Sequence, residues 1–290
     1  MTDSSRRQYQ RAWAVFRQFY CRFYGSENPI LPLVPNCIPL FISYLSFRKM
    51  AYSTITSYLS AISYVHKLKG LRDPTKSFLI QKLLTALSRQ RAADVRLPVT
   101  KPVLHQLVRS LDFTNSSAWQ RSLFGTIFLV AFYGLFRIGE LVVKSTHLGS
   151  SVVQYHSLTF LTCNGLPHIA KISISEYKHN PSKRLLEKTF LLSAQLLLSC
   201  SILGFAAIGQ VHFSVTLIFR LSLHQFNTEL QRCLKNCGLD LSRYKSHSFR
   251  IGGACHAADN GFSDAQIRAL GRWKSDAFKV YLRSEILTTN

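Results

Sequence analysis

The sequence predicts a multidomain, mostly α-helical chain: an all-α N-terminal domain, followed by an α+β domain with a small antiparallel sheet. Aromatic and aliphatic residues recur at helical spacing along much of the 290 residues, which predicts amphipathic helices. The stretch 88–98 is polar, basic and closed by proline, as interdomain linkers often are. Asn164-Gly165 separates two apolar runs, a pattern typical of a β-hairpin. A chain of this length has room for two domains that each bury a core.

The predicted N-terminal domain, residues 1–92, contains four helices. In the first, four aromatic residues recur at helical spacing, and the pattern stops at Gly25. A proline-rich loop follows this helix, and Asp73-Pro74 opens the last one. The four helical ranges are 6–24, 37–49, 54–69 and 75–90.

The predicted second domain, residues 98–290, begins with two helices, near 101–111 and 118–133. The hairpin follows them. Its apolar runs, 152–161 and 168–175, predict two neighbouring antiparallel strands.

Three further helices are predicted in the C-terminal part of the chain. Two of them begin with capping boxes, Ser222-x-x-Gln225 and Ser263-x-x-Gln266. His247 falls at the start of the helix between them. The backbone N–H groups of a first helical turn have no partner inside the helix, so this position is a natural anion site.

Positive charge dominates the composition. The chain has 36 lysine and arginine residues against 14 aspartate and glutamate residues, a formal net charge of +22. The charge is spread along the chain and not gathered in one tail, which favours a surface that binds phosphate backbones. RNA or an anionic membrane would also suit such a surface, so charge alone does not identify the partner.

The seven cysteines show no CxxC motif and no paired Cys/His spacing. This indicates free thiols in a reducing compartment and argues against a zinc site. The first residues, MTDSSRRQYQRAW, contain no apolar segment of the kind found in signal peptides, so secretion is not expected.

The stretch from His247 to Tyr281 contains residue types that can cut a phosphodiester without a metal. In that case fixed cationic groups must stabilise the transition state, and a planar guanidinium holds two phosphate oxygens at once. Arg137 and Arg250 could form such a clamp. Tyr281 is a usable nucleophile if its proton has an acceptor, which His247 supplies. Each of these residues alone, like Trp273, is more often structural, but their combination is rarer.

Four motifs resemble the boxes of the tyrosine recombinase (phage-integrase) family in wording, order and spacing. They are GLFRIGEL (134–141), HSFRIGGA (247–254), LGRWKS (270–275) and VYLR (280–283). The likeness is closest to recombinases of the eukaryotic Ngaro and DIRS groups of tyrosine-recombinase retrotransposons. It implies a helical core-binding (SAM-like) domain and a tyrosine recombinase catalytic domain that close around duplex DNA.

The resemblance also implies a role for each motif residue. Arg137 and Arg250 would clamp the scissile phosphate, and His247 would hydrogen-bond it or assist proton transfer. Trp273 stands where the family has histidine or tryptophan and would pack beside the nucleophile. Tyr281 would be that nucleophile, forming a 3′-phosphotyrosyl link and releasing a 5′-hydroxyl.

The family further has a lysine between its second and third strands, which protonates the leaving 5′ oxygen. Lys178 lies in a turn signal after the second apolar run and is the predicted general acid. Lys183 and Lys171 are the alternatives. Glu140, one turn after Arg137, matches an acidic position that supports the site.

Residues 191–219 depart from the pattern, because they include no Asp, Glu, Lys or Arg. The run is long enough to span a membrane, although its glutamines, histidine and serines weaken that interpretation. Back-translation of 194–215 and reading from one nucleotide upstream yields CPVATLLQYFRIRGNRPGPLF, which resembles the family segment after the third strand. We therefore hypothesise a frameshifted segment between two compensating indels, near 190–193 and 215–221.

The predicted function is that of a site-specific DNA recombinase or integrase of a mobile element. It would cut and rejoin DNA by transesterification, with no metal, cofactor or small-molecule ligand. The predicted partners are duplex DNA and further copies of the chain, from dimer to tetramer, in the nucleus and not on a membrane. The alternative is a catalytically decayed or co-opted DNA-binding protein. A membrane-associated protein, resting on 191–219 alone, is a third interpretation.

Overall fold

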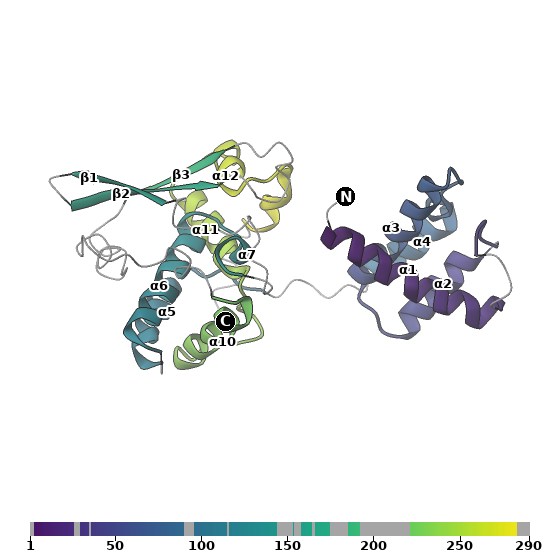
Figure 1. The fold of residues 1–290 in the computed structure, drawn as a ribbon, viewed down its shortest axis with the longest axis horizontal. Helices are drawn as coiled ribbons and strands as arrows, with labels where there is room; N and C mark the ends of the chain where they lie inside the picture. Colours follow the sequence, from purple (N-terminus) through teal and green to yellow (C-terminus); the bar gives the residue numbers. More distant parts are fainter. Residues whose placement is uncertain are drawn as a thin grey trace. The chain divides into compact units, whose positions relative to one another are not determined.

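The computed structural model describes residues 3–25, 30–34, 36–89, 96–114, 116–143, 153, 158–163, 166–174, 185–191 and 221–282. The chain divides into two compact units, Met1–Asp94 and Val95–Asn290. Helices dominate both units, and the second also contains a small antiparallel sheet (Figure 1). The predicted fold class is confirmed.

Unit 1 consists of four α-helices around an aromatic core. Phe16 and Tyr20 on the first helix are fully buried, and the edge of Phe41 meets the ring of Phe16 at 5.0 Å between centroids. Such pairs add specific geometry to the burial of apolar surface. The helices are α1 (Asp3–Tyr24), α2 (Cys37–Phe47), α3 (Tyr52–Leu68) and α4 (Phe78–Arg89).

The fourth helix begins later than the sequence pattern predicts. Pro74–Lys76 forms a separate 3₁₀ turn, and Ser77 is extended before α4 starts. The carboxylate of Asp73 accepts hydrogen bonds from the backbone N–H of Thr75, at 3.0 Å, and from its hydroxyl, at 2.7 Å. This local capping closes a short turn and does not start a continuous helix.

Unit 2 packs helices from distant parts of the chain around a second core. Phe128 on α6 stacks on Phe249 of α11 at 5.1 Å, and Phe226 of α10 meets Phe128 edge-on at 5.8 Å. The helices are α5 (Lys101–Ser110), α6 (Ala118–Tyr133), α7 (Ile138–Leu141), α10 (Leu223–Asn236), α11 (Ser248–Asp259) and α12 (Asp264–Gly271), with 3₁₀ turns η2 (Leu111–Phe113) and η5 (Asp276–Val280).

Both predicted capping boxes are present. Ser222 Oγ accepts the N–H of Gln225 at 3.1 Å, while the Gln225 side chain accepts the N–H of Ser222 at 2.9 Å. Ser263 and Gln266 make the same pair of bonds at the start of α12. Each box satisfies two N–H groups that a helix start otherwise leaves unpaired.

The sheet has the strand order β1-β2-β3, with antiparallel pairing throughout. Its strands are β1 (Leu158–Cys163), β2 (Leu166–Ile174) and β3 (Leu186–Leu191). Cys163 pairs with Leu166, so β1 and β2 form the predicted hairpin, while Asn164 and Gly165 themselves lie outside the described residues. In the second pair, Ile172 lies opposite Lys188, and both side chains are buried. A lysine therefore occupies the covered face of the sheet.

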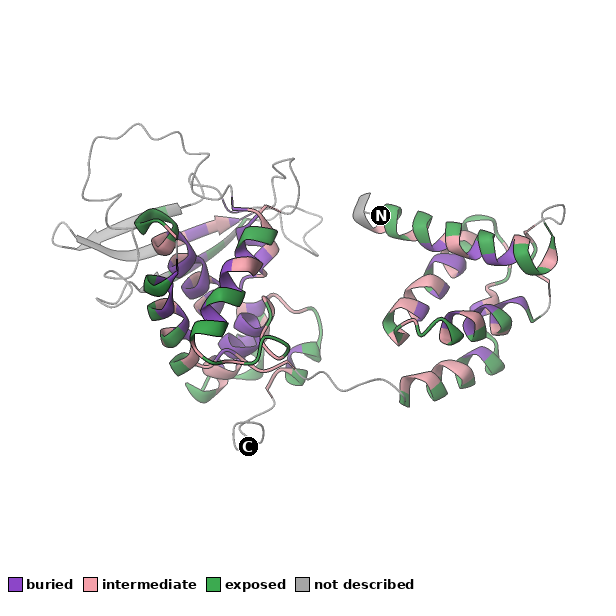
Figure 2. Ribbon diagram, turned by 90° about the horizontal axis from the view of Figure 1, so that it is seen from below, coloured by how far each residue is buried: buried purple, intermediate pink, exposed green. Residues whose placement is uncertain are grey.

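Two adjacent glycines let α11 approach neighbouring backbone. A Cβ on Gly252 would lie 1.8 Å from the carbonyl oxygen of Val99, and one on Gly253 would lie 2.1 Å from that of Phe132. Arg250 lies in the same run of buried residues on α11. Figure 2 shows such buried stretches within the helices of both units. The RIGG sequence thus brings an arginine and a close-packed helix surface to the same place.

No helix among the described residues is long and apolar enough to cross a membrane. Apart from Leu191, which ends β3, the uncharged run 191–219 lies outside the described residues, and so does the hypothesised frameshift.

Candidate active site

The predicted nucleophile and base are in contact. His247 is the N-cap residue of α11, and Tyr281 directly follows η5. A hydrogen bond of 3.1 Å joins His247 Nε2 to the Tyr281 hydroxyl, and the rings meet edge-on at 5.3 Å. With Nε2 unprotonated, the imidazole can accept the phenol proton. The backbone of Tyr281 is held as well, because Cys255 Sγ donates to its carbonyl oxygen at 3.0 Å.

Arg250, three residues after His247, is only 1% exposed. Its two terminal nitrogens donate to the main-chain carbonyls of Leu135 and Gly271. The Trp273 ring covers the guanidinium at 4.2 Å, a cation–π contact, and lies 5.8 Å from the ring of Tyr281. Trp273 therefore packs beside the predicted nucleophile, as the resemblance implies.

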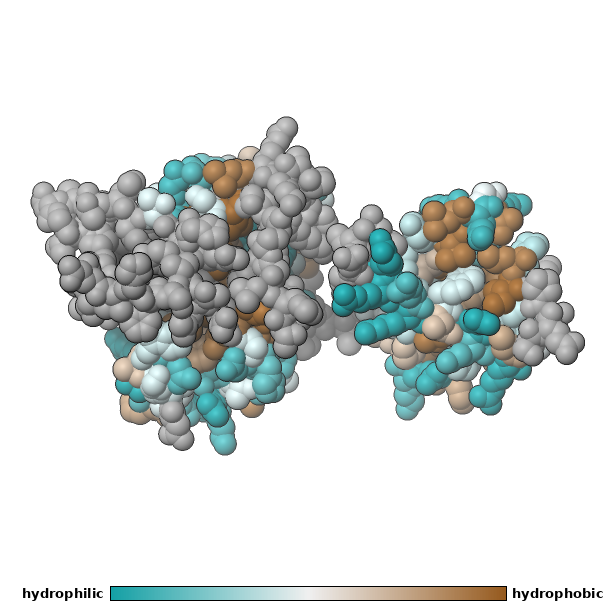
Figure 3. Space-filling model, viewed as in Figure 1, coloured by the Kyte–Doolittle hydropathy of each residue, from teal (hydrophilic) through white to brown (hydrophobic). Residues whose placement is uncertain are grey.

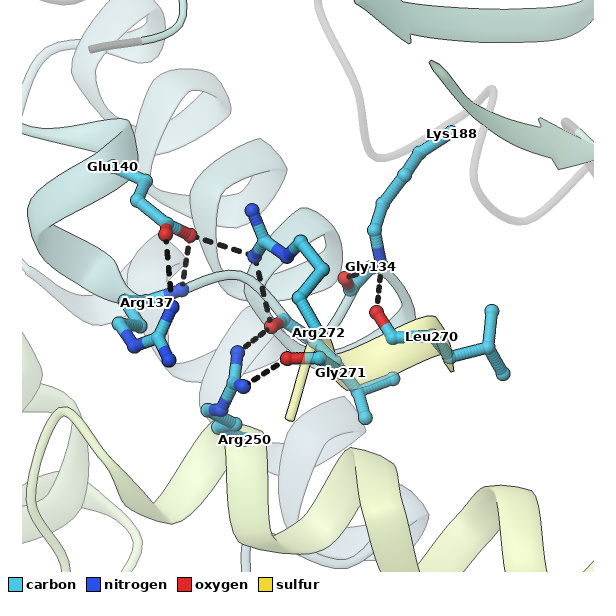
Figure 4. A network of polar contacts seen from close by, with 9 residues as sticks. Gly134, Arg137, Glu140, Lys188, Arg250, Leu270, Gly271 and Arg272 are labelled. Atoms are coloured by element: carbon cyan, nitrogen blue, oxygen red, sulfur yellow. Dashed lines mark hydrogen bonds and ion pairs between the residues drawn. The ribbon is translucent and has the colours of Figure 1, made fainter. Parts of the chain in front are cut away.

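Arg137 and Glu140 form an ion pair at the start of α7. Arg137 Nη1 donates to Glu140 Oε1 at 3.2 Å, and the Arg137 backbone N–H donates to Oε2 at 2.9 Å (Figure 4). The Arg137 side chain is 28% exposed, whereas that of Glu140 is 8% exposed. Arg137 is therefore the more accessible of the two predicted clamp arginines, since Arg250 is almost fully covered.

Two further cations join the site. Arg272 Nη2 donates to Glu140 Oε2 at 2.7 Å, and the Arg272 guanidinium lies 5.0 Å from the Phe136 ring. Lys188 Nζ donates to the carbonyl oxygen of Gly134 at 2.6 Å and to that of Leu270. In Figure 4 these side chains converge from β3, α11 and the loops around 134–137 and 270–272.

The buried cations thus connect two loops: residues 134–137, and residues 270–272, where α12 ends at Gly271 and the chain turns at Arg272. Lys188 bonds to one carbonyl in each loop, and so does Arg250. Each loop contains a non-glycine residue in the left-handed region, Leu135 at φ 50° and Arg272 at φ 57°. This conformation costs free energy in L-residues and persists where the surroundings enforce it, often at functional sites.

Burial and mutual repulsion shift the pKa values of these groups. Burial, followed by the charges of Arg137 and Arg272, lowers the pKa of Arg250 to about 9, which leaves it protonated at neutral pH. Burial, followed by the charges of Arg272 and Arg250, lowers the pKa of Lys188 to about 7. Burial alone would raise the pKa of Glu140, but Arg272, Arg137 and their hydrogen bonds together lower it. The site therefore has an excess of positive charge.

The predicted general acid, Lys178, lies outside the described residues, and so does Lys183. Lys171, the other alternative, is on β2 and forms an ion pair of 2.7 Å with Glu187 on β3. The described residues include no group of three or more His, Cys, Asp or Glu side chains that could hold a metal ion.

Sequence reasoning missed Lys188 and Arg272. The alternation in 186–191 contained a signal for the first, because it places Lys188 on the same strand face as Leu186 and Phe190. Arg272 stands inside the LGRWKS motif, directly before Trp273, but the motif alone does not show that its side chain turns inward.

No protein-family model matches the chain, and neither does any curated protein. Several solved structures do match it. The integrase of transposon Tn1549, in complex with transposon right end DNA, has a TM-score of 0.63 at 10% identity and covers 98% of this chain and 90% of its own. A lambda integrase dimer bound to a COC′ core site has a TM-score of 0.62 at 14% identity and covers 100% and 92%.

The XerH site-specific recombinase, bound to a palindromic difH substrate, also has a TM-score of 0.62 at 14% identity, and it covers 95% of this chain and 75% of its own. At such identities the likeness concerns the fold. The chain has the fold of tyrosine recombinases and integrases.

The lowered pKa of Lys188 predicts a specific pH dependence of stability. Below about pH 7 the lysine is protonated in both the folded and the unfolded state, and the full cost of burying its charge applies. Between pH 7 and its ordinary value of 10.5 the folded state gives up the proton first, so stability rises with pH.

We therefore expect the free energy of unfolding of the wild type, minus that of Lys188→Met, to increase over this range by up to about 1.4 kcal/mol per pH unit. Methionine cannot make the two hydrogen bonds of Lys188. Their loss changes the difference in free energy of unfolding by the same amount at every pH. Denaturant unfolding at several pH values measures the difference, and a difference independent of pH would contradict the assignment.

Proposed function

We propose that this protein cuts and rejoins DNA strands through a covalent phosphotyrosine, as a tyrosine recombinase. The observation that carries the proposal is the contact between Tyr281 and His247. Beside this contact lies a cluster of charged side chains in which the positive groups outnumber the carboxylate of Glu140. A phosphodiester supplies the negative charge that this cluster lacks, and its phosphorus is the atom that a tyrosine can attack.

In the proposed reaction the Tyr281 oxygen attacks the scissile phosphorus while its proton passes to His247 Nε2. The bond from phosphorus to Tyr281 forms as the bond to the 5′ oxygen breaks, and that oxygen takes a proton from a lysine. Arg137, as the accessible cation, makes the first phosphate contact. Arg250 is covered by Trp273 and reaches the phosphate once this cover is displaced. Rejoining is the same sequence in reverse, with a 5′-hydroxyl as the attacking group.

Unit 1 supplies a surface suited to duplex DNA. Every lysine and arginine from Arg6 to Arg89 is exposed, whereas Asp73 is the one acid among the described residues of this range. Exposed rings lie among these cations, as where Lys82 Nζ lies 5.2 Å from the Phe78 ring. On the face shown in Figure 3, unit 1 has both strongly hydrophilic and hydrophobic regions. Such a surface favours contact with the sugar–phosphate backbone.

The likeness of the motifs to Ngaro and DIRS recombinases supports a finer proposal, that the reaction serves the integration of a mobile element. Copies of the chain would assemble on DNA as dimers or tetramers. The lambda integrase to which the chain is similar is itself a dimer on its core site. A nuclear location stays a prediction.

A second candidate function is a DNA-binding protein that has lost turnover. The uncharged run 191–219 favours it, since a frameshift there would replace part of the catalytic domain while leaving unit 1 and the motif residues intact.

A trapping experiment separates the two functions. On a suicide substrate nicked beside the cleavage position, the short fragment diffuses away, and the wild type should accumulate a covalent 3′-phosphotyrosyl complex that survives denaturant. Tyr281→Phe removes the attacking oxygen and keeps the ring, so it should abolish the adduct while DNA affinity is unchanged. Denaturing electrophoresis and filter binding measure the two quantities.

The substrate should carry the terminal repeats of the parent element, and EDTA should have no effect because Arg137 and Arg250 replace a metal. A folded wild type that binds these repeats and never forms the adduct would contradict the enzyme and support the DNA-binding protein.

The identity of the general acid can be tested with the leaving group. Lys178→Ala should slow cleavage of ordinary DNA, and a 5′-phosphorothiolate should restore the rate because a thiolate leaves without a proton. Lys188→Ala should not be rescued, because Lys188 bonds to two main-chain carbonyls and acts through the loops. Rescue of Lys188→Ala but not of Lys178→Ala would make Lys188 the acid.

A further inference from the structure

Arg272 is an arginine whose side chain turns inward from a loop. It caps the C-terminus of α12 with φ 57°, and its side chain is 5% exposed. Gly271 precedes it, and a Cβ there would lie 1.6 Å from the Trp273 ring, so a larger residue at this position would displace that ring. After Gly271 the Trp273 ring lies over Arg250, and the Arg272 side chain reaches Glu140 on α7.

The partner of Arg272 is the carboxylate that holds Arg137. Glu140 Oε1 accepts from Arg137 Nη1, and Oε2 accepts both from the Arg137 backbone N–H at 2.9 Å and from Arg272 Nη2 at 2.7 Å. The bond to Arg272 is the shortest of the three. A carboxylate bound on both oxygens has a fixed plane, which in turn fixes the direction of the Arg137 guanidinium.

We propose that Arg272 is a positioning residue for Arg137: it holds the Glu140 carboxylate ionised and oriented, and through it sets the phosphate-binding face of Arg137. The inference rests on the proposed function, in which Arg137 contacts the scissile phosphate. Because Arg272 belongs to the loop that leads to Tyr281, the same contact links the orientation of the clamp to the segment that carries the nucleophile.

The charges around Glu140 explain why one arginine is not enough. Burial of this carboxylate favours its neutral form, and the attraction of Arg272 and of Arg137 opposes this. Lys188 from β3 and Arg250 from α11 also face it. When Arg272 is removed, the pKa of Glu140 rises, and a protonated carboxyl no longer holds Arg137 as an ion pair.

The test compares Arg272→Gln with Arg268→Gln on the suicide substrate at saturating DNA. Arg268 lies one turn earlier on α12, is 43% exposed and pairs with Asp276 at 3.4 Å, so its loss removes the same charge without touching Glu140. Arg272→Gln should form the adduct roughly 10- to 100-fold more slowly, the range found when an outer partner of a metal-binding side chain is lost. As the pH is lowered, the rate of adduct formation should begin to fall at a higher pH in Arg272→Gln than in Arg268→Gln.

Two further variants distinguish positioning from general support of the fold. Glu140→Gln should be slowed like Arg272→Gln, and the double variant should be no slower than the slower single one, because both act on one contact. Arg272→Lys keeps the positive charge and should recover part of the rate. It also serves as the test variant if Arg272→Gln does not fold.

A measurement without DNA separates this inference from the proposed function. In protein with ¹³C-labelled glutamate carboxyls, the Glu140 signal, identified by its loss in Glu140→Gln, should titrate at a higher pH in Arg272→Gln than in the wild type. An unchanged Glu140 pKa, or a raised pKa with an unchanged adduct rate, would overturn the role of Arg272. If the wild type forms no adduct, the proposed function fails, and the titration alone decides whether Arg272 holds the carboxylate.

Discussion

The rest of the site depends on buried cations that bind two loops together. Removing a charge from water costs several kcal/mol unless polar partners replace the lost hydration. Here the partners are main-chain carbonyls at Gly134, Leu135, Leu270 and Gly271, together with the carboxylate of Glu140. Lys188 and Arg250 each donate to both loops, so separating the loops would leave two buried cations without their acceptors.

This constraint explains how the nucleophile is placed before any DNA is bound. A small apolar cluster under the 270–281 segment includes Leu135, Ala254 and Phe278, and Tyr281 packs against its edge. The loop that supplies carbonyls to the cations therefore also packs against the residues that carry Tyr281. The segment that carries Tyr281 is therefore ordered in advance, which lowers the cost of forming the transition state, and in the proposed reaction the Trp273 cover of Arg250 is the part that has to move.

The sequence was sufficient for those features that depend on local pattern. Helical spacing and capping residues predicted the longer helices of both units, and Asn164-Gly165 predicted the hairpin of β1 and β2, whereas the short helix α7 and the strand β3 were not predicted from local pattern. The contact between His247 and Tyr281, 34 residues apart, was expected from the chemistry of the two side chains and from the resemblance, and not from spacing. Arg272 was missed because its motif does not show where the side chain points, and Lys188 was missed because strand alternation gives its face but not the groups that it meets there. Their roles come from tertiary contacts that no motif encodes, with main-chain carbonyls for Lys188 and with the Glu140 carboxylate for Arg272.

The central claim is that loops 134–137 and 270–272 form one cooperative unit. Native-state hydrogen exchange of the wild type without DNA tests it most directly, using the hydrogen-bonded amides of Glu140 and Trp273 as probes. We expect the two amides to exchange through openings of similar free energy, well above that of a mobile loop. If the Trp273 amide exchanges at nearly unprotected rates while that of Glu140 stays protected, the cations do not hold the loops together.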